Sequence, residues 1–156
     1  MSKTIFYRLF RIGRIPQKLR PVLESEGLAV WDEGIPGRTV LRHFKAPGRR
    51  STYRLERFSG SLAVTGRRVV GFAYSRPVIN VPLDDPRLAR VGVALVKAAW
   101  IELSFEAQLF HADWRGSIRL GYRTPLAARF LSCLGAHCRT QGPPAAARTH
   151  RRPHHE

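Results

Sequence analysis

Few side chains in this sequence have the types and spacing that catalysis requires. His111 and Asp113 are separated by one residue and could share a face of a short strand, but no nucleophile is identifiable beside them. Asp84 and Asp85 are adjacent, so in an extended chain their carboxylates point to opposite sides, which favours a turn or helix-cap role. The sequence has neither a glycine-rich phosphate loop nor a serine elbow between glycines. We therefore expect a protein without enzymatic activity and without a cofactor.

Thiols and imidazoles that could approach a metal ion gather near the C-terminus. They are Cys133, His137, Cys138, His150, His154 and His155. Their spacing matches no established zinc module. Cys133 falls on the apolar face of an expected helix, where a thiol usually packs, and histidines in a polar tail are usually solvated. We expect no metal site, and we expect Cys133 and Cys138 to be reduced thiols because a bridge between them would close a very short loop.

The charge of the chain is strongly basic, with 27 Lys and Arg against 11 Asp and Glu and a formal net charge of +16. Residues 1–138 carry +13 of this charge and residues 139–156 carry +3. Such a surface attracts polyanions over about one Debye length, so phospholipid head groups and nucleic acid are both candidate partners. Most of the basic residues are arginine, and a GC-rich genome would produce this excess without selection for binding.

The first 27 residues form a basic, amphipathic segment. On a helix drawn at 100° per residue, one side is apolar and the other basic. The apolar side holds Ile5, Phe6, Leu9, Phe10 and Ile12, and the basic side holds Lys3, Arg8, Arg11 and Arg14. The apolar side would either enter a membrane, with Ile5, Phe6, Leu9 and Phe10 inserted, or pack on the protein itself, as amphipathic helices usually do. A second short helix is expected around Leu19–Leu23, restarted at Pro21 and closed by Gly27.

Residues 28–122 show the pattern of antiparallel hairpins, with short β-type runs separated by turn residues. The runs are Leu28–Trp31, Thr39–Lys45, Ser51–Phe58, Ser61–Val64, Arg68–Tyr74, Val78–Val81, Arg90–Lys97, Ile101–Glu106 and Ser117–Tyr122. Turns are expected at Gly34–Gly37, at Pro47–Gly48 and at Thr65–Gly66. If the last two runs pair, Glu102 and Glu106 would face Arg115 or Arg119 across the ladder as structural partners.

One amphipathic helix follows the strands. Thr124 can cap its first turn, Pro125 suits its first position, and Gly135 supplies its exit. Its apolar face holds Leu126, Ala127, Phe130, Leu131, Cys133 and Leu134, and would cover the sheet or close the end of a barrel. After Cys138 no bulky apolar residue occurs, so we expect residues 139–156 to be a disordered basic tail.

One hairpin carries a family resemblance. In Gly60–Phe72, GSLAVTGRRVVGF, a glycine-led strand ends in Thr65 and an arginine opens the next strand after Gly66. This hairpin and the order of elements from about Leu28 to Cys138 resemble the pleckstrin-homology-like (PH-like) superfold, including its GRAM and bacterial PH-like branches. The resemblance implies an α+β, mainly β domain: an antiparallel barrel or sandwich of about seven strands closed by one C-terminal helix, over residues 28–138.

The same resemblance implies a binding function, because members of this superfold commonly bind phosphoinositides, peptides or protein partners. Head-group binders of the family concentrate basic residues in the first hairpin loop. Here the nearest approach to that pattern is Arg49 and Arg50, after Pro47–Gly48. The basic residues of the chain are spread more widely than the lipid-binding pattern requires.

Our leading hypothesis is a non-catalytic binding or scaffold domain that acts at an anionic surface, the inner face of a membrane. The expected anion-binding residues are Lys3, Arg8, Arg11, Arg14, Arg49, Arg50, Arg67 and Arg68. The chain has no apolar run that would span a bilayer and no secretory signal, so a cytoplasmic location with peripheral membrane binding is expected. The sequence leaves the oligomeric state open.

Two alternatives remain open. A nucleic-acid-associated protein would use arginines that alternate with aromatic residues on neighbouring hairpins. These are Arg42, Arg49, Arg50, Arg54, Arg57, Arg67 and Arg68, among Phe44, Tyr53 and Phe58. The same alternation also describes a charged outer face over an apolar inner one. In that case the protein would be a protein-interaction module whose charge is incidental.

Overall fold

A single curled sheet forms most of the protein. The computed structural model describes Lys3 and residues 13–140. Its strands are β1 (Leu28–Ala46), β2 (Arg49–Thr65), β3 (Arg68–Ala73), β4 (Arg76–Pro82), β5 (Gly92–Lys97), β6 (Trp100–Glu106), β7 (Arg115–Arg123) and β8 (Arg139–Thr140). They lie in the order β4-β3-β2-β1-β7-β6-β5-β8, and every neighbouring pair is antiparallel except β5 and β8. The sheet curls into a half-barrel, which confirms the prediction of a mainly β fold.

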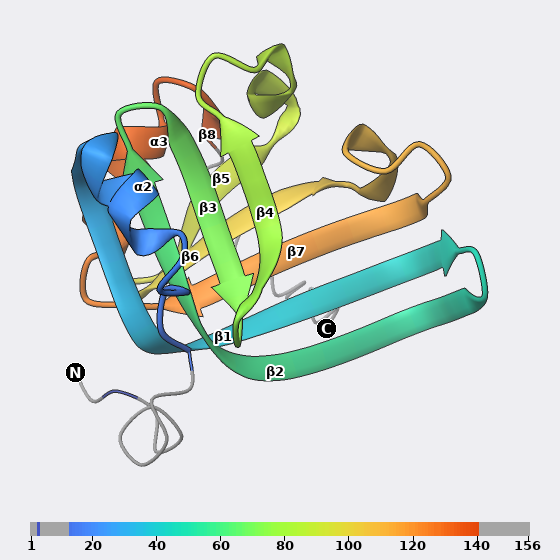
Figure 1. Cartoon of the computed structure of the whole chain (residues 1–156). Helices are drawn as coiled ribbons and strands as arrows, with labels where there is room; N and C mark the ends of the chain where they lie inside the picture. Colours follow the sequence, from blue (N-terminus) through green and yellow to red (C-terminus); the bar gives the residue numbers. More distant parts are fainter. Residues whose placement is uncertain (1–2, 4–12, 141–156) are drawn as a thin grey trace, which may run out of the picture.

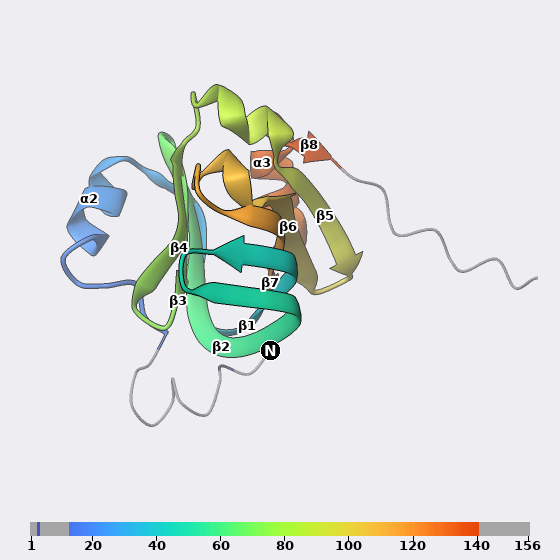
Figure 2. The same cartoon turned by 90° about the vertical axis from the view of Figure 1, so that its right-hand side faces the viewer.

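The helices are short. They are α2 (Arg20–Ser25), the 3-10 helices η1 (Pro86–Arg90) and η2 (Ala107–Leu109), and α3 (Ala127–Leu134). Asp85 caps η1 by accepting a hydrogen bond of 2.9 Å from the backbone N–H of Arg87, as expected for an aspartate before a turn. Figure 2 shows β3 and β4 on one side of the molecule and β5 and β6 on the other, with the β1–β2 hairpin in front.

The prediction of a turn at Gly34–Gly37 was wrong. This segment lies inside β1, so the runs Leu28–Trp31 and Thr39–Lys45 form one strand, and the two runs opposite them form β2. A register shift between Glu33 and Ile35 absorbs the irregular residues, with Gly34 at φ +66°, while pairing with β2 continues. The glycines therefore mark a bulge and a bend rather than a chain reversal, and both long strands curve sharply at this corner (Figure 1).

Gly60 is the residue of β2 that permits the bend. A Cβ atom at this position would collide with the backbone carbonyl oxygen of Phe72 on β3. The strands β2 and β3 therefore approach more closely here than any other residue type allows. The adjoining hairpin turns at Gly66–Arg67, one residue later than the predicted Thr65–Gly66, because Thr65 is still the last residue of β2. The Thr65 hydroxyl accepts hydrogen bonds from the N–H groups of Arg67 and Arg68 across this turn.

The main apolar core lies in the concave face of the sheet, where α3 covers one end. Ala127, Phe130 and Leu134 of α3 are fully buried against the strands. The helix begins at Ala127 rather than directly after Thr124, and Thr124 is itself fully buried. Its hydroxyl accepts a hydrogen bond from the Leu126 N–H (3.1 Å) and donates one to the Asp32 carboxylate (2.7 Å), which ties the helix start to β1. Gly135 is at the helix end, as predicted.

A second, smaller core lies on the opposite face of β2 and β3. Ile15 and Leu23 of the segment before β1 pack there on Ala63, Val70 and Phe72. This part of the N-terminal region therefore contacts the domain itself. The expected apolar residues Ile5, Phe6, Leu9 and Phe10, with Arg8 and Arg11, lie outside the described residues.

The folded region extends slightly further than the sequence indicates. Arg139 and Thr140 were expected in the tail, but they form β8, which pairs in parallel with the start of β5. The Arg139 N–H donates a hydrogen bond of 2.9 Å to the Val91 carbonyl oxygen. The expected tail from residue 141 onward lies outside the described residues.

Candidate functional site

A cleft of about 620 Å³ opens in the concave face of the half-barrel. Its floor is made by apolar side chains of β1, β2, β4, β6, β7 and the loop after η2. They are Leu41, Phe44, Phe58, Ile79, Val81, Phe105, Phe110, Trp114, Ile118 and Leu120. Its rim is polar and mostly basic: Arg49, Glu56, Arg57, Arg76, Arg87 and His111. An apolar cleft with a few polar groups at its edge is the usual form of a small-molecule site.

A bulge in β1 turns Phe44 into this cleft. Side chains alternate along a strand, so Phe44 would face away from Leu41 if the strand were regular. His43 instead adopts a positive φ of 49°, and the register of β1 with β7 shifts between Arg42 and Lys45. Gly116 of β7 makes the close approach possible, because a Cβ there would lie 2.5 Å from the His43 carbonyl oxygen.

Aromatic rings hold the open end of the cleft in shape. Trp114 contacts Phe44 edge-on at 5.3 Å between ring centroids and stacks on His111 at 3.7 Å. Phe105 and Phe110 form a second edge-on pair at 5.2 Å. The loop between η2 and β7 is thereby fixed over the ends of β1 and β6.

A buried hydrogen bond joins β7 to β3 next to Phe58, one of the residues that line the cleft. The Tyr122 hydroxyl of β7 donates a hydrogen bond of 3.0 Å to the Phe72 carbonyl oxygen of β3, and both residues are fully buried. Burial raises the pKa of Tyr122, so the hydroxyl stays a donor. Phe58, which lines the cleft, packs edge-on against Tyr122 at 5.6 Å.

The charges at the rim are only partly compensated. Arg87 forms an ion pair of 2.7 Å with Asp85, and its hydrogen bonds hold the pKa of Asp85 below the usual value. Glu56 forms an ion pair of 2.7 Å with Arg54. Within residues 13–140 and Lys3, neither Arg49 nor Arg76 has a carboxylate within ion-pair distance. The rim therefore presents net positive charge to a ligand.

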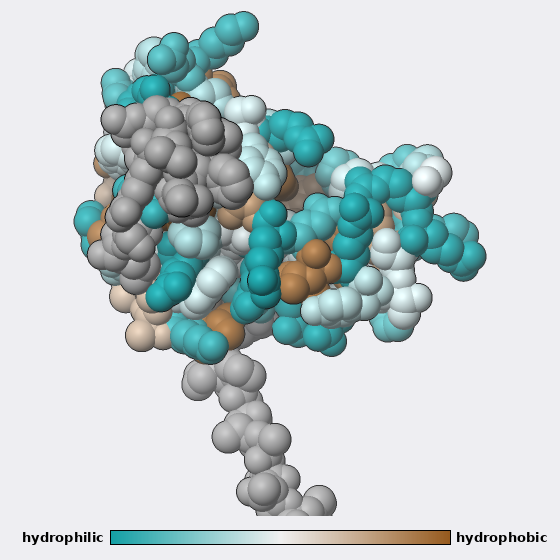
Figure 3. All heavy atoms as spheres, turned by 90° about the horizontal axis from the view of Figure 1, so that it is seen from below, coloured by the Kyte–Doolittle hydropathy of each residue, from teal (hydrophilic) through white to brown (hydrophobic). Residues whose placement is uncertain are grey.

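Three more basic residues lie near Arg49 where the β1–β2 hairpin ends. In the strand register, Lys45 of β1 lies opposite Arg50 of β2 on one side and opposite Arg115 of β7 on the other. Arg49 directly precedes Arg50 in the chain. We call Lys45, Arg49, Arg50 and Arg115 the hairpin-end cluster. All four are exposed, and none has an ion pair within the described part of the chain. Hydrophilic side chains gather at this end, on the right of Figure 3.

The structure brings together only some of the residues that the sequence singled out. Arg49 and Arg50 lie in the hairpin-end cluster, whereas Arg67 lies at the far end of β2, in the turn to β3. Arg68 is bound to Glu26 through Nε, at 2.9 Å from each carboxylate oxygen, and this contact lowers the pKa of Glu26. Lys3 pairs with Asp32. The positive charges of Arg68 and Lys3 are therefore compensated within the chain.

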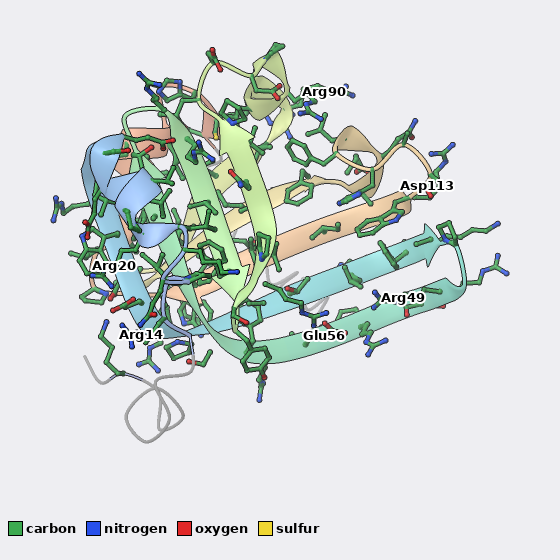
Figure 4. All side chains as sticks on the ribbon, viewed as in Figure 1. Arg14, Arg20, Arg49, Glu56, Arg90 and Asp113 are labelled. Atoms are coloured by element: carbon green, nitrogen blue, oxygen red, sulfur yellow. The ribbon has the colours of Figure 1, made fainter. Side chains whose placement is uncertain are left out.

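Lys45 and Arg115 were missed by the sequence analysis as members of a site. The pairing of β1 with β7 joins segments far apart in the chain, and no local signal predicts it. Figure 4 shows Arg49 on β2 and Asp113 in the loop before β7 at the same end of the molecule. Asp113 is the acidic residue beside Arg115 in this loop, and it forms no ion pair within the described residues.

The other residues that the sequence singled out for catalysis or metal binding do not come together in a site. His111 and Asp113 lie in a loop rather than on a strand, and His111 is stacked on Trp114. No group of three metal-ligating side chains occurs among Lys3 and residues 13–140. Cys133 and Cys138 are free thiols, and burial raises the pKa of Cys138 to about 11. Glu102 and Glu106 were expected to pair with an arginine across the ladder. The Oε1 atom of Glu102 lies 3.9 Å from Nη1 of Arg119, so this expectation is confirmed for Glu102.

The chain matches no family model, no curated protein and no solved structure. Among the described residues, no helix has the length and apolar content needed to cross a membrane. The site must therefore be interpreted from its own geometry.

Proposed function

We propose that this protein is a non-catalytic, PH-like binding domain that acts at an anionic membrane surface, the inner face of the cell membrane. The observation that carries the proposal is the hairpin-end cluster. It places four cationic side chains on three adjacent strands, exposed and without ion pairs in the described part of the chain.

The order of the elements supports a PH-like fold. Seven consecutive antiparallel strands, β1 to β7, curl around one core, and a single helix after them covers one end. The hairpin that carried the resemblance, Gly60–Phe72, forms the end of β2 and most of β3 with its turn at Gly66–Arg67. The first hairpin, β1–β2, turns at Pro47–Gly48, and Arg49 and Arg50 begin β2 directly after this turn. They are the nearest approach in this chain to the loop in which head-group binders of this superfold place their basic residues.

The electrostatics of this end favour a flat, extended anion over a single buried one. The cluster side chains are solvated, so each keeps its full charge without a desolvation cost. Near an anionic membrane each Lys or Arg contributes about 1 kcal/mol, and the attraction reaches about one Debye length. Four such residues at one end of the molecule would orient the domain with its hairpin toward the lipid head groups.

Nucleic acid is the second candidate, and one observation favours it. Tyr53 on β2 is 59% exposed, and the Arg42 guanidinium lies 5.8 Å from the centre of its ring. An exposed aromatic ring beside arginines can stack on an unpaired base while the cations contact phosphates. Membrane binding would not require this ring.

The test is a vesicle co-sedimentation assay with a charge-matched control. Vesicles of phosphatidylcholine with about one third phosphatidylglycerol are compared with pure phosphatidylcholine vesicles. The cluster variant is Lys45→Gln, Arg49→Gln and Arg50→Gln, and the control is Arg90→Gln, Lys97→Gln and Arg123→Gln, three exposed cations outside the cleft lining and the cluster.

We expect binding to anionic vesicles only, weakened on the order of 100-fold in the cluster variant at about 1 kcal/mol for each charge. The control should bind far more tightly than the cluster variant. Equal losses in the two variants would show that only total charge matters. Absence of binding to anionic vesicles, together with tight binding of single-stranded DNA that is lost on Tyr53→Ala, would replace the membrane proposal with the nucleic-acid one.

A further inference from the structure

The cleft in the half-barrel shares Arg49 with the hairpin-end cluster, but the proposed membrane contact does not involve its apolar floor. Its volume of about 620 Å³ falls within the range of about 300–1,000 Å³ typical of small-molecule sites. Its floor is almost entirely apolar, and Leu41, Phe105 and Ile118 retain 6%, 8% and 9% exposure although they belong to the core. These side chains therefore present a small apolar surface to the space above them.

The lining favours an unbranched apolar chain over a peptide. Every residue of a peptide brings a backbone N–H and C=O that need hydrogen-bond partners, and the apolar side chains of the floor offer none. The other way to bind a peptide is to add a strand to an exposed edge. The edge strand β4 contains Pro77 and Pro82, which lack N–H donors, so it is a poor template for an added strand.

The rim favours an anionic head group on that chain. The Arg49 guanidinium lies 5.9 Å from the centre of the Phe44 ring, at the point where the apolar floor meets solvent. Arg76 opens β4 on the rim, and neither arginine has an ion pair within the described residues. The one rim carboxylate, Glu56, is neutralised by Arg54. A carboxylate or phosphate at this rim would meet positive charge without a competing acid.

We infer that the cleft binds a single-chain anionic amphiphile, with its acyl chain on the aromatic and aliphatic floor and its head group at Arg49, beside the Phe44 ring. This inference rests on the proposed function, since Arg49 also belongs to the hairpin-end cluster and would bring the cleft mouth to the membrane. The shared chemistry is one acyl chain with one anionic group. A free fatty acid and an anionic lysophospholipid both supply it.

The position of the tryptophans allows a direct test. Trp114 lines the cleft, whereas Trp31 packs in the second core and Trp100 stacks on Arg38 at 4.6 Å. A fatty acid brominated near the middle of its chain quenches only tryptophans that it contacts. The double variant Trp31→Phe with Trp100→Phe leaves Trp114 as the reporter, and Trp31→Phe with Trp114→Phe leaves Trp100. Each variant is used only if its melting temperature shows that it is folded.

We expect saturable quenching in the Trp114 reporter and none in the Trp100 reporter. If a double variant does not fold, the single variant Trp114→Phe is compared with the parent protein, and quenching should disappear. Affinity, measured by calorimetry below the micelle concentration, should rise roughly tenfold for every two methylenes added to a saturated fatty acid. No quenching of Trp114, or quenching of all three tryptophans alike, would overturn the inference.

The head group is tested separately. Arg49→Gln should weaken binding of the fatty acid at least tenfold, whereas Arg90→Gln, which removes an exposed cation outside the cleft lining, should leave it unchanged. The uncharged fatty alcohol of the same length should bind both proteins equally and more weakly than the acid binds the parent. Equal affinity for acid and alcohol in the parent would contradict the assigned role of Arg49.

Two further ligands distinguish the source of the chain. If lysophosphatidylglycerol displaces the brominated fatty acid and lysophosphatidylcholine does not, an anionic lysolipid is a ligand of the cleft. If only free fatty acids compete, the ligand class is the carboxylate. Anionic vesicle binding that persists while Trp114 is never quenched would leave the proposed function standing and refute the acyl-chain site alone.

Discussion

Replacing Tyr122 with Phe removes one oxygen atom from the centre of the domain. The aromatic ring and its packing against Phe58 are retained, and only the hydrogen bond to the Phe72 carbonyl oxygen (3.0 Å) is lost. Both residues are fully buried, so no bulk water is available to replace the lost donor. A buried acceptor left without this partner costs about 1–3 kcal/mol, which is a large fraction of the about 5–15 kcal/mol that stabilises a typical domain.

The assay is equilibrium unfolding in urea, followed by tryptophan fluorescence. With a slope of about 2 kcal/mol per molar urea, the midpoint should fall by about 0.5–1.5 M. The melting temperature should fall by about 2–4 °C for each kcal/mol lost. Tyr53→Phe is the matched control, because it removes the same oxygen from a side chain that is 59% exposed, and its midpoint should not move. If both variants unfold at the parent midpoint, the Tyr122 hydroxyl does not stabilise the domain.

Two further predictions concern the bend and one ion pair. Gly60→Ala should lower the free energy of unfolding by at least about 1–3 kcal/mol, because the new methyl group would overlap the Phe72 carbonyl oxygen. Gly121→Ala is the control, because its Cβ would make ordinary contacts at 3.5 Å, and it should lower that free energy less in the same urea titration. The pKa of Glu26 is lowered in the folded protein, chiefly by its hydrogen bonds to Arg68, so its contribution to stability is present above the unfolded pKa of about 4.3 and is lost as pH falls through the lower, folded pKa. Melting temperatures from pH 7 down to pH 3 should therefore fall less steeply for Glu26→Gln than for the parent, and parallel curves would contradict the assigned role of the pair.

Local signals predicted the elements whose conformation depends on nearby residues. The turn at Pro47–Gly48 and the helix exit at Gly135 follow from turn chemistry, and the turn after Thr65 was predicted to within one residue. The strand expected over Arg90–Lys97 forms over Gly92–Lys97. Glu102 and Arg119 could be paired because their strands are consecutive. In each case the information lies within a few residues or in one hairpin.

The candidate site could not be predicted because long-range pairing builds it. Glycine and proline at Gly34–Gly37 are equally compatible with a turn and with a bulge, and only pairing with β2 decides between them. The position of Phe44 depends on the positive φ of His43, which sequence alternation does not show. The sequence analysis also predicted Arg68 as an anion-binding residue from its charge alone. In the structure Glu26, which is far from Arg68 in the chain, compensates that charge.

Hydrogen–deuterium exchange in the presence of vesicles tests the central claim most directly, because it locates the contact without altering the protein. With vesicles containing phosphatidylglycerol, we predict slower exchange in peptides that cover residues 44–51 and 110–116, and no change with phosphatidylcholine alone. Peptides that cover residues 13–25, where Ile15 and Leu23 pack on the opposite face of the sheet, should exchange at the same rate in both. Protection centred on α2, or no protection at the hairpin end despite binding, would contradict the proposal that this end faces the membrane.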